Sequence, residues 1–561
     1  MALRTNGHGE GRGHGEGRLD TRLRGLRLRI RLTAEFRMQQ AVLIHAPGRE
    51  PPLLNKSFGD KRFYASLDMA RRYMTASPNL RMRHLLRRDC GAALDRMLPL
   101  RKPWEPNKIN ASTPYDFRGK NLTPYGGLLP VATMLEKLGF QSLLEETLTV
   151  RRATKAMGMY QFFMGIVLGI YVGFSRLNQL RFIAQDPLLT GILKVSGLPP
   201  QSTLWRFLAA LHLNVAVQIL SVQQQMRERV WAANVRLTGA TLDTDTTVHT
   251  LYGKQMGGRK SYNPKNKGKK SYQPILTFLA ETREYVAGGL HNGDRPTGKE
   301  VAEHLRQAFG ALPACVKQIF ARADSGFYCW NAVATYVERG CQFVIVARKT
   351  APLLDLLHAA EWKPSPETDA DAQCEFTYPP DGWGKAFRFV ALRYEQPPKP
   401  EEVEQYQLFA TSKYTYRVFV TDMPEPIHLV VAFYNLRAGA ENLIKEANND
   451  AGLAAHPSGR FDVNRNYFQM VMLAYNLNCW LMLFNREEQE EVATLRHTTL
   501  ATARLKFLFV AAKIWSHAGR TGVSYSDHYA EKGMFGRLMD RLRGIMPRGG
   551  SFAPVLAGVL T

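Results

Sequence analysis

The sequence predicts an α/β protein in which a mixed sheet with flanking helices is interrupted by a β insertion and preceded by an all-helical N-terminal region. Three observations lead to this prediction. Apolar residues recur at three- and four-residue spacing across 126–237, which indicates helices. At Thr238 the period changes to that of strands, and strands and helices then alternate to residue 349. Residues 350–430 are rich in strand-forming aromatic residues.

The helical region has two clear segments. The apolar run Phe162–Phe174 has thirteen residues, too few to span a bilayer, so a buried helix is expected there. The stretch "PPQSTLWRFLAALHL" predicts a helix start, with Ser202 or Thr203 as its N-cap.

The segment 238–349 predicts the element order β-β-β-α-β-α-β. The expected strands and helices are, in order, strands at 238–250, 274–281 and 285–291, a helix at 298–310, a strand at 316–324, a helix at 329–339 and a strand over "CQFVIVAR". The second and third strands are joined by "TRE", a short hairpin connection. Helical periodicity resumes at about 435 and continues through "NYFQMVMLAYNLNCWLMLFNR".

The charge of the chain points to an acidic partner. Lys and Arg number 74 against 49 Asp and Glu, a net charge of +25, and nucleic acid is the commonest partner of so basic a protein. The spacing of the six cysteines fits no zinc site, so reduced, buried thiols are expected. The N-terminus is rich in Gly and Arg and lacks the apolar segment of a secretory signal, which predicts a cytoplasmic protein.

Two carboxylates precede a basic segment in "LDTDTTVHTLYGKQMGGRKSYNPKNKGKKSYQP". Asp243 and Asp245 stand two apart in a predicted strand and therefore point to the same side of the sheet. Seven cations and no acid follow them: Lys254, Arg259, Lys260, Lys265, Lys267, Lys269 and Lys270. Acids beside such a segment suggest metal ions next to a bound polyanion, whereas a solvated loop is the structural alternative.

A third acid is found by helix geometry. At about 100° per residue, a stripe roughly 80° wide along the helix after Phe433 holds Tyr434, Arg437, Glu441, Lys445 and Asn448. Glu441 thus shares a face with an aromatic residue and two cations, a face suited to DNA. Glu446 lies well off this stripe, and Glu446 and Asp450 are expected to be solvated.

These elements have the order of an RNase H-like fold, in which acids from the first strand, the end of the fourth strand and a later helix meet at one edge. The "Tyr-x2-Arg-x3-Glu" of Tyr434, Arg437 and Glu441 resembles the signature of bacterial insertion-sequence DDE transposases of the cut-and-paste type, which carry a β insertion before the catalytic Glu. "DTDTTVHTLYGKQMGG", "ADSGFY" and "FQMVMLAYNLNCWLMLF" resemble other parts of that family. The resemblance covers roughly 120–520.

The resemblance implies a site and its cofactors. Asp245, Asp324 and Glu441 would be the catalytic residues, holding two Mg²⁺ ions for which Mn²⁺ would substitute. The family's first Asp commonly stands two residues before a Ser or Thr, which favours Asp245, with Thr247 after it, and leaves Asp243 in reserve.

The resemblance also implies partners. The basic segment, with Tyr434, Arg437 and Lys445, would contact double-stranded DNA, both the terminal inverted repeats of an element and its target. Trp383 in "DGWGKAF" is a candidate for stacking on a flipped base, or else a packed core residue. A homodimer would bind two element ends, associated with the bacterial nucleoid and not with a membrane.

One residue departs from the family signature, and three other readings compete with the proposed site. The signature ends with Lys seven residues after the Glu, where this chain has Asn448. Lys445, one turn earlier, would substitute, or the chain would be a decayed, non-catalytic DNA-binding protein.

"Asp-x-Asp-x-Thr" also matches a phosphoaspartyl phosphatase motif with Asp243 as nucleophile, but that motif needs a helix soon after the first strand. A calcium loop fails because Val248 stands where a Gly is needed.

Each remaining acid has an ordinary structural role as an alternative. Asp324 is suitably placed to cap the helix that follows it, and Glu441 with Lys445 makes a common i,i+4 pair. The expected organisation is a low-complexity, disordered basic arm at 1–40, a mostly helical DNA-binding region at 41–237, the first part of the catalytic core at 238–349, the β insertion at 350–430, the second part of the core at 431–510 and a basic C-terminal tail at 511–561.

Overall fold

The computed structural model describes residues 107, 109–150, 157–234, 237–264, 266–395, 413–486, 498–548 and 551–556. The chain divides into two units, Met1–Asp116 and Phe117–Thr561. All helices and strands named here belong to the second unit. The predicted basic arm at 1–40 and the first part of the predicted helical region, up to residue 106, lie outside the described residues.

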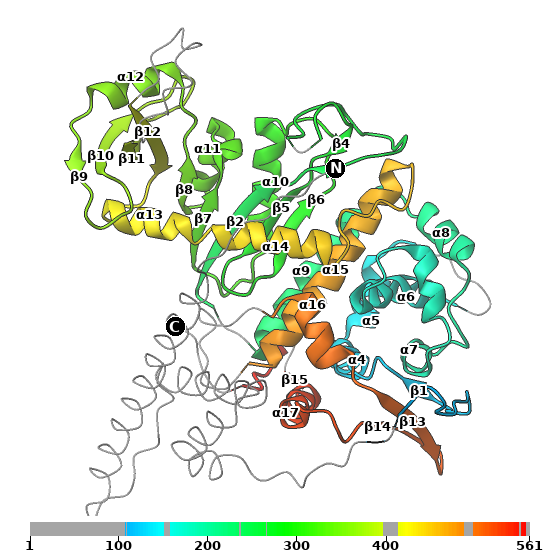
Figure 1. The fold of residues 1–561 in the computed structure, drawn as a ribbon. Coiled ribbons are helices and arrows are strands. Elements are labelled where there is room, and N and C mark those ends of the chain that lie inside the picture. The colour runs from blue at the N-terminus through cyan, green and yellow to red at the C-terminus, as the bar shows by residue number, and fades with distance from the viewer. Residues whose placement is uncertain are drawn as a thin grey trace, which may run out of the picture. The chain divides into compact units, whose positions relative to one another are not determined.

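The second unit contains a nine-stranded mixed sheet, in the order β6-β5-β2-β7-β8-β12-β11-β10-β9 (Figure 1). Its first half contains β2 (Gly239–Thr246), β5 (Ile275–Leu279), β6 (Tyr285–Gly289), β7 (Gln318–Ala323) and β8 (Gln342–Val346). β2, β7 and β8 run parallel to one another, whereas β5 and β6 are antiparallel neighbours. A short ladder of β3 (His249–Thr250) and β4 (Ser271–Tyr272) lies between β2 and β5 in the chain.

The helices between these strands confirm the predicted element order. α10 (Gly298–Gly310) connects β6 to β7, and α11 (Trp330–Glu338) connects β7 to β8. Thr297 caps α10: its hydroxyl accepts the Glu300 N–H, and the Glu300 carboxylate accepts the Thr297 N–H in return. This reciprocal cap satisfies N–H groups at the helix start and so fixes where α10 begins.

The strands of residues 350–430 extend the same sheet. They are β9 (Lys363–Pro364), β10 (Ala372–Tyr378), β11 (Phe387–Glu395) and β12 (Tyr414–Thr421), preceded by α12 (Ala351–Ala359). β12 pairs antiparallel with β8, with Phe419 opposite Val346. The predicted strand-rich segment therefore exists, but it continues the core sheet and is not a sheet of its own.

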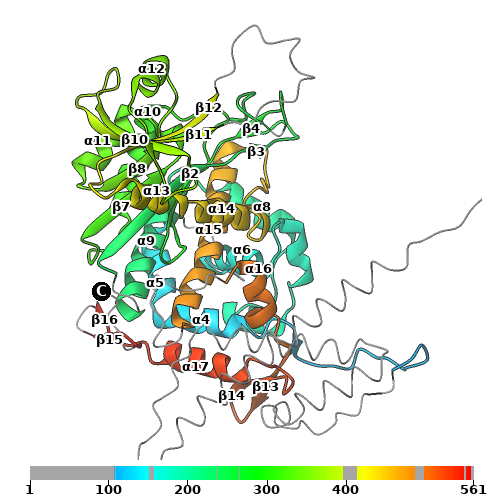
Figure 2. The ribbon, with the colours of Figure 1, turned by 60° about the vertical axis from the view of Figure 1, so that its left-hand side comes forward.

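The helix expected after residue 435 is divided in the structure. α13 (Ile427–Asn435) and α14 (Ala438–Asn449) are separated by Leu436 and Arg437, both of which keep right-handed helical backbone angles. α15 (Phe461–Phe484) follows and is buried along nearly its whole length. Figure 2 shows α14 crossing in front of α15 beside the sheet.

The N-terminal part of the second unit is helical, as predicted. Its helices are α4 (Leu128–Lys137), α5 (Phe140–Thr147), α6 (Met159–Val172), α7 (Pro187–Leu193), α8 (Gln201–Ala209) and α9 (Val215–Asn234). α6 is buried from Phe162 onward, which confirms the buried helix expected from its apolar run. The predicted N-cap of α8 is wrong: the helix starts after Pro200, and no side chain caps it. Among the helices in the described ranges, none combines the length and apolar character that a membrane span requires.

The C-terminal part is folded around the helical region. It contains α16 (Leu500–Ala503), the π-helix η5 (Arg504–Leu508), β13 (Ala512–His517), β14 (Arg520–Tyr525), α17 (Lys532–Arg543), β15 (Pro547–Arg548) and β16 (Ser551–Phe552). β13 and β14 form a hairpin that pairs with β1 (Leu122–Thr123). Residues 511–548 therefore do more than form a basic tail.

A buried carboxylate joins the helical region to the sheet. Glu284, in the turn before β6, accepts hydrogen bonds from Arg227 and Trp231 of α9 and from Trp480 of α15. The Arg227 and Glu284 side chains are both fully buried. A buried charge is tolerated only when it is paired and hydrogen-bonded, so this network fixes α9 and α15 against the edge of the sheet that carries β6.

Candidate active site

Two of the predicted acids leave neighbouring parallel strands at the same level. In the pairing of β2 with β7, Thr244 lies opposite Ala323. Asp245 and Asp324 are the next residue on each strand, so the strand register brings both acids to one edge of the sheet. Asp245 is 9% exposed. Asp324 precedes the 3₁₀ turn η2 (Ser325–Phe327), where its Oδ1 accepts the Gly326 N–H at 2.9 Å.

Arg437 connects the third acid to the first. Its Nη2 lies 2.8 Å from Asp245 Oδ2, and its Nη1 lies 3.7 Å from Glu441 Oε1. The Arg437 side chain is 7% exposed, whereas that of Glu441 is 69% exposed. The guanidinium therefore emerges from the junction of α13 and α14, and Glu441 stands at the solvent side of the pair.

The ionisation of Asp245 reflects these neighbours. Burial, together with the negative charges of Asp324 and Glu441, raises the pKa of Asp245 to about 6. Arg437 and the Thr246 N–H oppose the shift. All three predicted acids are therefore close enough to interact electrostatically, and their mutual repulsion favours the presence of a cation.

The donor chemistry of these acids fits Mg²⁺, which prefers hard oxygen ligands and takes few carboxylates. Within the described residues, however, no three His, Cys, Asp or Glu side chains are already gathered closely enough to hold a metal ion. Between Asp245 and Glu441 the positive charge is supplied by Arg437. The three acids are thus oxygen ligands of a suitable kind, and the single positive charge of Arg437 lies between two of them.

Asp243, the reserve acid, has a different role in the structure. It is 1% exposed, and Arg322 holds it with two hydrogen bonds, from Nε to Oδ1 at 2.6 Å and from Nη2 to Oδ2 at 2.8 Å. Arg322 Nη1 also donates to the Phe433 carbonyl at the end of α13. Both Asp243 oxygens are thus committed to a buried ion pair, which disfavours Asp243 as a metal ligand or as a phosphatase nucleophile.

The predicted stripe along residues 434–448 is buried at its start and exposed further along α14. Tyr434 is 7% exposed and packs on Phe419, with ring centroids 4.9 Å apart. The Arg437 guanidinium lies over the Tyr434 ring at 5.9 Å. This burial leaves Tyr434 little surface for DNA, so its position suits a support for Arg437. Lys445 is exposed on α14.

The expectation that Glu446 is solvated is wrong. Glu446 is 6% exposed, and its Oε1 accepts the Leu500 N–H at the start of α16 at 2.8 Å. Asp450 Oδ2 accepts the next N–H, that of Ala501, at 3.3 Å. Acidic groups stabilise the N-terminus of a helix, and these two caps tie the end of α14 to a segment fifty residues further along the chain.

Trp383 lies in an aromatic cluster. Its ring centroid is 5.1 Å from that of Tyr328, 5.7 Å from Phe387 and 6.2 Å from Trp330. Trp383 is partly buried, so the structure supports the packed alternative more than the base-stacking one.

The basic segment is exposed and firmly held. Lys265 lies outside the described residues; the other six cations, Lys254, Arg259, Lys260, Lys267, Lys269 and Lys270, are exposed. Asn263 and Asn266 both donate side-chain hydrogen bonds to Thr250 Oγ1, and the Tyr272 hydroxyl donates to the Met256 carbonyl. These hydrogen bonds hold the backbone that carries the cations, so the segment has more internal structure than a solvated loop requires.

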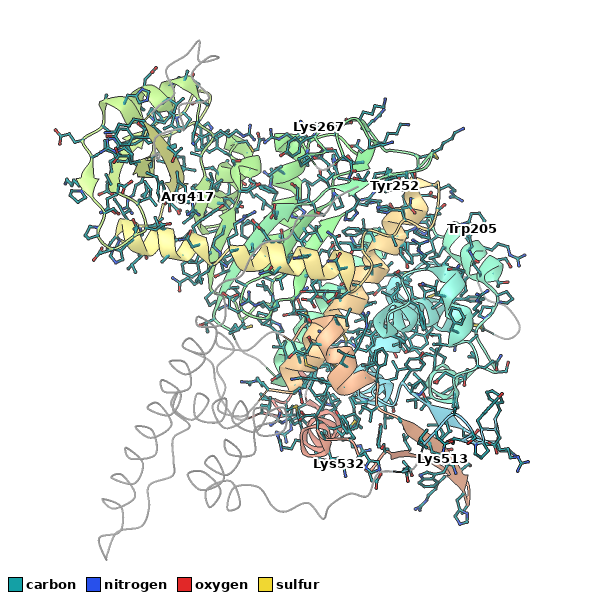
Figure 3. All side chains as sticks on the ribbon, viewed as in Figure 1. Trp205, Tyr252, Lys267, Arg417, Lys513 and Lys532 are labelled. Carbon is teal, nitrogen blue, oxygen red and sulfur yellow. The ribbon has the colours of Figure 1, made fainter. Side chains whose placement is uncertain are left out.

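Two aromatic residues in this segment had not been singled out from the sequence. Tyr252 is 82% exposed and Tyr262 is 71% exposed. Tyr252 and Lys267, both labelled in Figure 3, project from the surface near β4. The signal in the sequence was the interleaving of aromatic residues with Lys and Arg, which is typical of surfaces that bind nucleic acid.

Comparison with known proteins identifies the family. The chain matches the family described as Transposase DDE domain group 1 over residues 106–547. Among solved structures, it is similar to a piggyBac transposase in a synaptic complex with hairpin DNA, at 10% identity over 63% of this chain and 74% of that chain, with a TM-score of 0.36. A similarity that low decides nothing about function. Among proteins with curated descriptions, none matches. Since the family match spans most of its length, the chain belongs to the transposases with a DDE domain of group 1.

Proposed function

We propose that this chain is a DNA transposase that cleaves at the ends of an insertion sequence and joins them to target DNA, with Asp245, Asp324 and Glu441 as metal-binding catalytic residues. One observation carries the proposal. Asp245 and Asp324 leave adjacent parallel strands in register, and Arg437 links Asp245 to Glu441. These contacts support a site that draws on three acids far apart in the chain.

An RNase H-like core is the fold that this proposal requires. The sheet order β6-β5-β2-β7-β8, with the first strand of the core between the second and the fourth, supports it. In that fold the acids come from the first strand, the end of the fourth and a later helix. Here Asp245 on β2, Asp324 after β7 and Glu441 on α14 would be those acids.

The residues of the site have separate tasks. Two Mg²⁺ ions, or Mn²⁺ in their place, would activate a water molecule or a 3′-hydroxyl and stabilise the leaving oxygen. Asp245, with a pKa of about 6, is mostly ionised at neutral pH and so offers anionic oxygen ligands. The positive charge of Arg437 lies between Asp245 and Glu441 and reduces the repulsion between their carboxylates.

DNA is the partner that the surface supports best. The exposed cations of the basic segment would hold phosphates, which position a duplex without reading its sequence. Tyr252 and Tyr262 would stack on bases that leave the duplex. A homodimer bound to two element ends, at the bacterial nucleoid, remains what the resemblance implies.

A second reading is a catalytically decayed transposase that still binds DNA. Its basis is Asn448, which replaces the Lys of the family signature. The two readings differ in one measurable respect, since only an active enzyme nicks or excises DNA in the presence of Mg²⁺. Inverted repeats beside the gene, with a short direct duplication of target outside them, would mark a copy that has moved.

The test uses the gene's own flanking DNA. A supercoiled plasmid carrying that DNA is incubated with the full chain and Mg²⁺, and the excised fragment is measured on a gel. We expect nicks at the element ends, and no cleavage when EDTA replaces Mg²⁺. Binding without any cleavage would favour the decayed protein, and cleavage in EDTA would overturn the metal mechanism.

A further inference from the structure

Asn448 has both ends of its amide engaged. Its Oδ1 lies 2.8 Å from His249 Nε2, and its Nδ2 donates to Thr247 Oγ1 at 3.4 Å. Thr247 follows the catalytic candidate Asp245 by two residues, and His249 starts β3. The last turn of α14, the helix that carries Glu441, is therefore bonded to the segment that leaves β2.

His249 is built into this contact as a neutral donor. It is 3% exposed, and burial lowers its pKa to about 4. Because Asn448 Oδ1 can only accept, the neutral ring carries its proton on Nε2 and donates to it. The ring packs against His456, with centroids 5.2 Å apart, and His456 packs edge-on against Tyr272 of β4. The partner of Asn448 is thus held from the other side by the scaffold of the basic segment.

We propose that Asn448 is a positioning residue, which with His249 and Thr247 clamps α14 to the segment after β2 and so sets the distance between Glu441 and Asp245. The role of the clamp in cleavage rests on the proposed function, whereas the contact itself is a property of the fold. The departure from the family signature then has another explanation. Asn448 has a buried partner, His249, and does not indicate a decayed enzyme.

A Lys at this position could not keep the contact that Asn448 makes. Asn448 Oδ1 accepts a hydrogen bond from His249 Nε2, whereas an ammonium only donates, so the neutral imidazole would have to carry its proton on Nδ1 instead. The amide of Asn448 carries no charge, so the phosphate binding expected of the signature Lys is not the task of Asn448.

The test compares substitutions on one helix. Asn448→Ala removes both hydrogen bonds, and Asn448→Lys restores the signature residue. Asn449→Lys is the matched control, because Asn449 is the next residue of α14 and is exposed. His249→Leu removes the donor, whereas His249→Gln keeps an N–H donor near the same place. Each variant is assayed for binding of element ends without metal, for cleavage rate and for the Mg²⁺ concentration that gives half-maximal cleavage.

We expect Asn448→Ala and Asn448→Lys to raise the half-maximal Mg²⁺ concentration at least threefold and to lower the cleavage rate at least tenfold. DNA affinity and its salt dependence should stay within twofold of the wild-type values. Asn449→Lys should leave the Mg²⁺ requirement unchanged, and His249→Gln should recover most of the activity lost in His249→Leu. Higher activity in Asn448→Lys, or weaker DNA binding with an unchanged Mg²⁺ requirement in Asn448→Ala, would overturn the proposal.

A double-substitution cycle separates this proposal from the proposed function. If the wild-type chain cleaves no DNA, the unfolding midpoints of Asn448→Ala, His249→Leu and the double variant still report on the clamp. Destabilisation in the double variant that is smaller than the sum of the two single effects would support the contact. Additive effects would refute it, whatever the chain does to DNA.

Discussion

Arg322 and Asp243 form a bidentate buried ion pair between neighbouring strands, with hydrogen bonds of 2.6 and 2.8 Å. Two residues further along the same strand, Asp245 is bound by Arg437, whose other terminal nitrogen faces Glu441. β2 thus carries two acids on one face with different partners. The first is enclosed by a structural ion pair, and the second lies at the proposed site.

This difference predicts that the same substitution affects mainly stability at Asp243 and mainly cleavage at Asp245. Asp243→Asn should lower the free energy of unfolding by about 3–5 kcal/mol, because it leaves the buried Arg322 charge without its partner. Asp245→Asn should lower it much less and should abolish cleavage. Urea unfolding followed by circular dichroism measures the first effect. Full stability in Asp243→Asn together with an absence of cleavage would place Asp243 at the site instead.

The basic segment predicts a salt-dependent contribution to DNA binding. Removing one phosphate-binding cation should reduce the slope of log affinity against log salt by about 0.9, so replacing Lys267, Lys269 and Lys270 together by Ala should reduce it by up to about 2.7. Binding should weaken equally for element ends and for unrelated DNA, because phosphate contacts carry no sequence information. Arg306→Ala is the control, since this exposed cation of α10 pairs with Glu338 outside the segment. An unchanged slope in the triple variant would mean a solvated loop.

Tyr252 predicts a different kind of contact. Tyr252→Ala should weaken binding to end DNA with unpaired bases by roughly 5- to 150-fold, the range for one stacked base, with the salt slope unchanged. Tyr252→Phe keeps the ring and should bind as the wild-type chain does. Fluorescence of 2-aminopurine placed near the cleavage point reports the stacking. Equal binding of all three proteins to paired and unpaired DNA would argue against a stacking role.

His249 predicts a pH dependence of stability. Its pKa is about 4 in the folded chain and near 6.5 when unfolded, so below pH 6.5 the unfolded chain takes up a proton that the folded chain does not. The stability from this residue is complete above pH 6.5 and is lost as the pH falls to about 4, by about 3 kcal/mol. His456 adds an effect of the same sign, since burial lowers its pKa to about 3.

The variant His249→Gln isolates that contribution. Between pH 7 and pH 4 it should lose about 3 kcal/mol less unfolding free energy than the wild-type chain, although both retain His456. Denaturant unfolding at four or five pH values provides the comparison. Parallel pH curves for the two proteins would show that His249 titrates normally and is not buried as described.

The element order of the core was predictable because strand and helix periods are local properties of the sequence. The assignment of Asp245 and Asp324 to two strands of one sheet used the same information: Asp245 lies within the predicted strand 238–250, and Asp324 ends the predicted strand 316–324. The alternation along β7 also places Arg322 on the face of Asp243, but only the strand register shows that the two residues are opposite each other.

The contacts that sequence reasoning missed join segments far apart in the chain. Glu446 is well off the active face of its helix, and only the path of the chain over the next fifty residues shows that it caps α16. In the sequence, Asn448 could be compared only with the Lys of the family signature. Its partner His249 lies some two hundred residues earlier in the chain. The sheet likewise continues from β8 to β12 through a pairing between strands that are far apart in the chain. Periodicity carries no information about such partners.

Cleavage of a supercoiled plasmid carrying the gene's flanking DNA, by the wild-type chain and by Asp245→Asn, Asp324→Asn and Glu441→Gln, tests the central claim most directly. The account predicts Mg²⁺-dependent cuts at the element ends by the wild-type chain. Each variant should bind those ends with wild-type affinity in EDTA and cut them at least about a thousandfold more slowly, since a metal ligand supplies several kcal/mol of transition-state stabilisation. Cutting at the wild-type rate by any one of the three variants would contradict it.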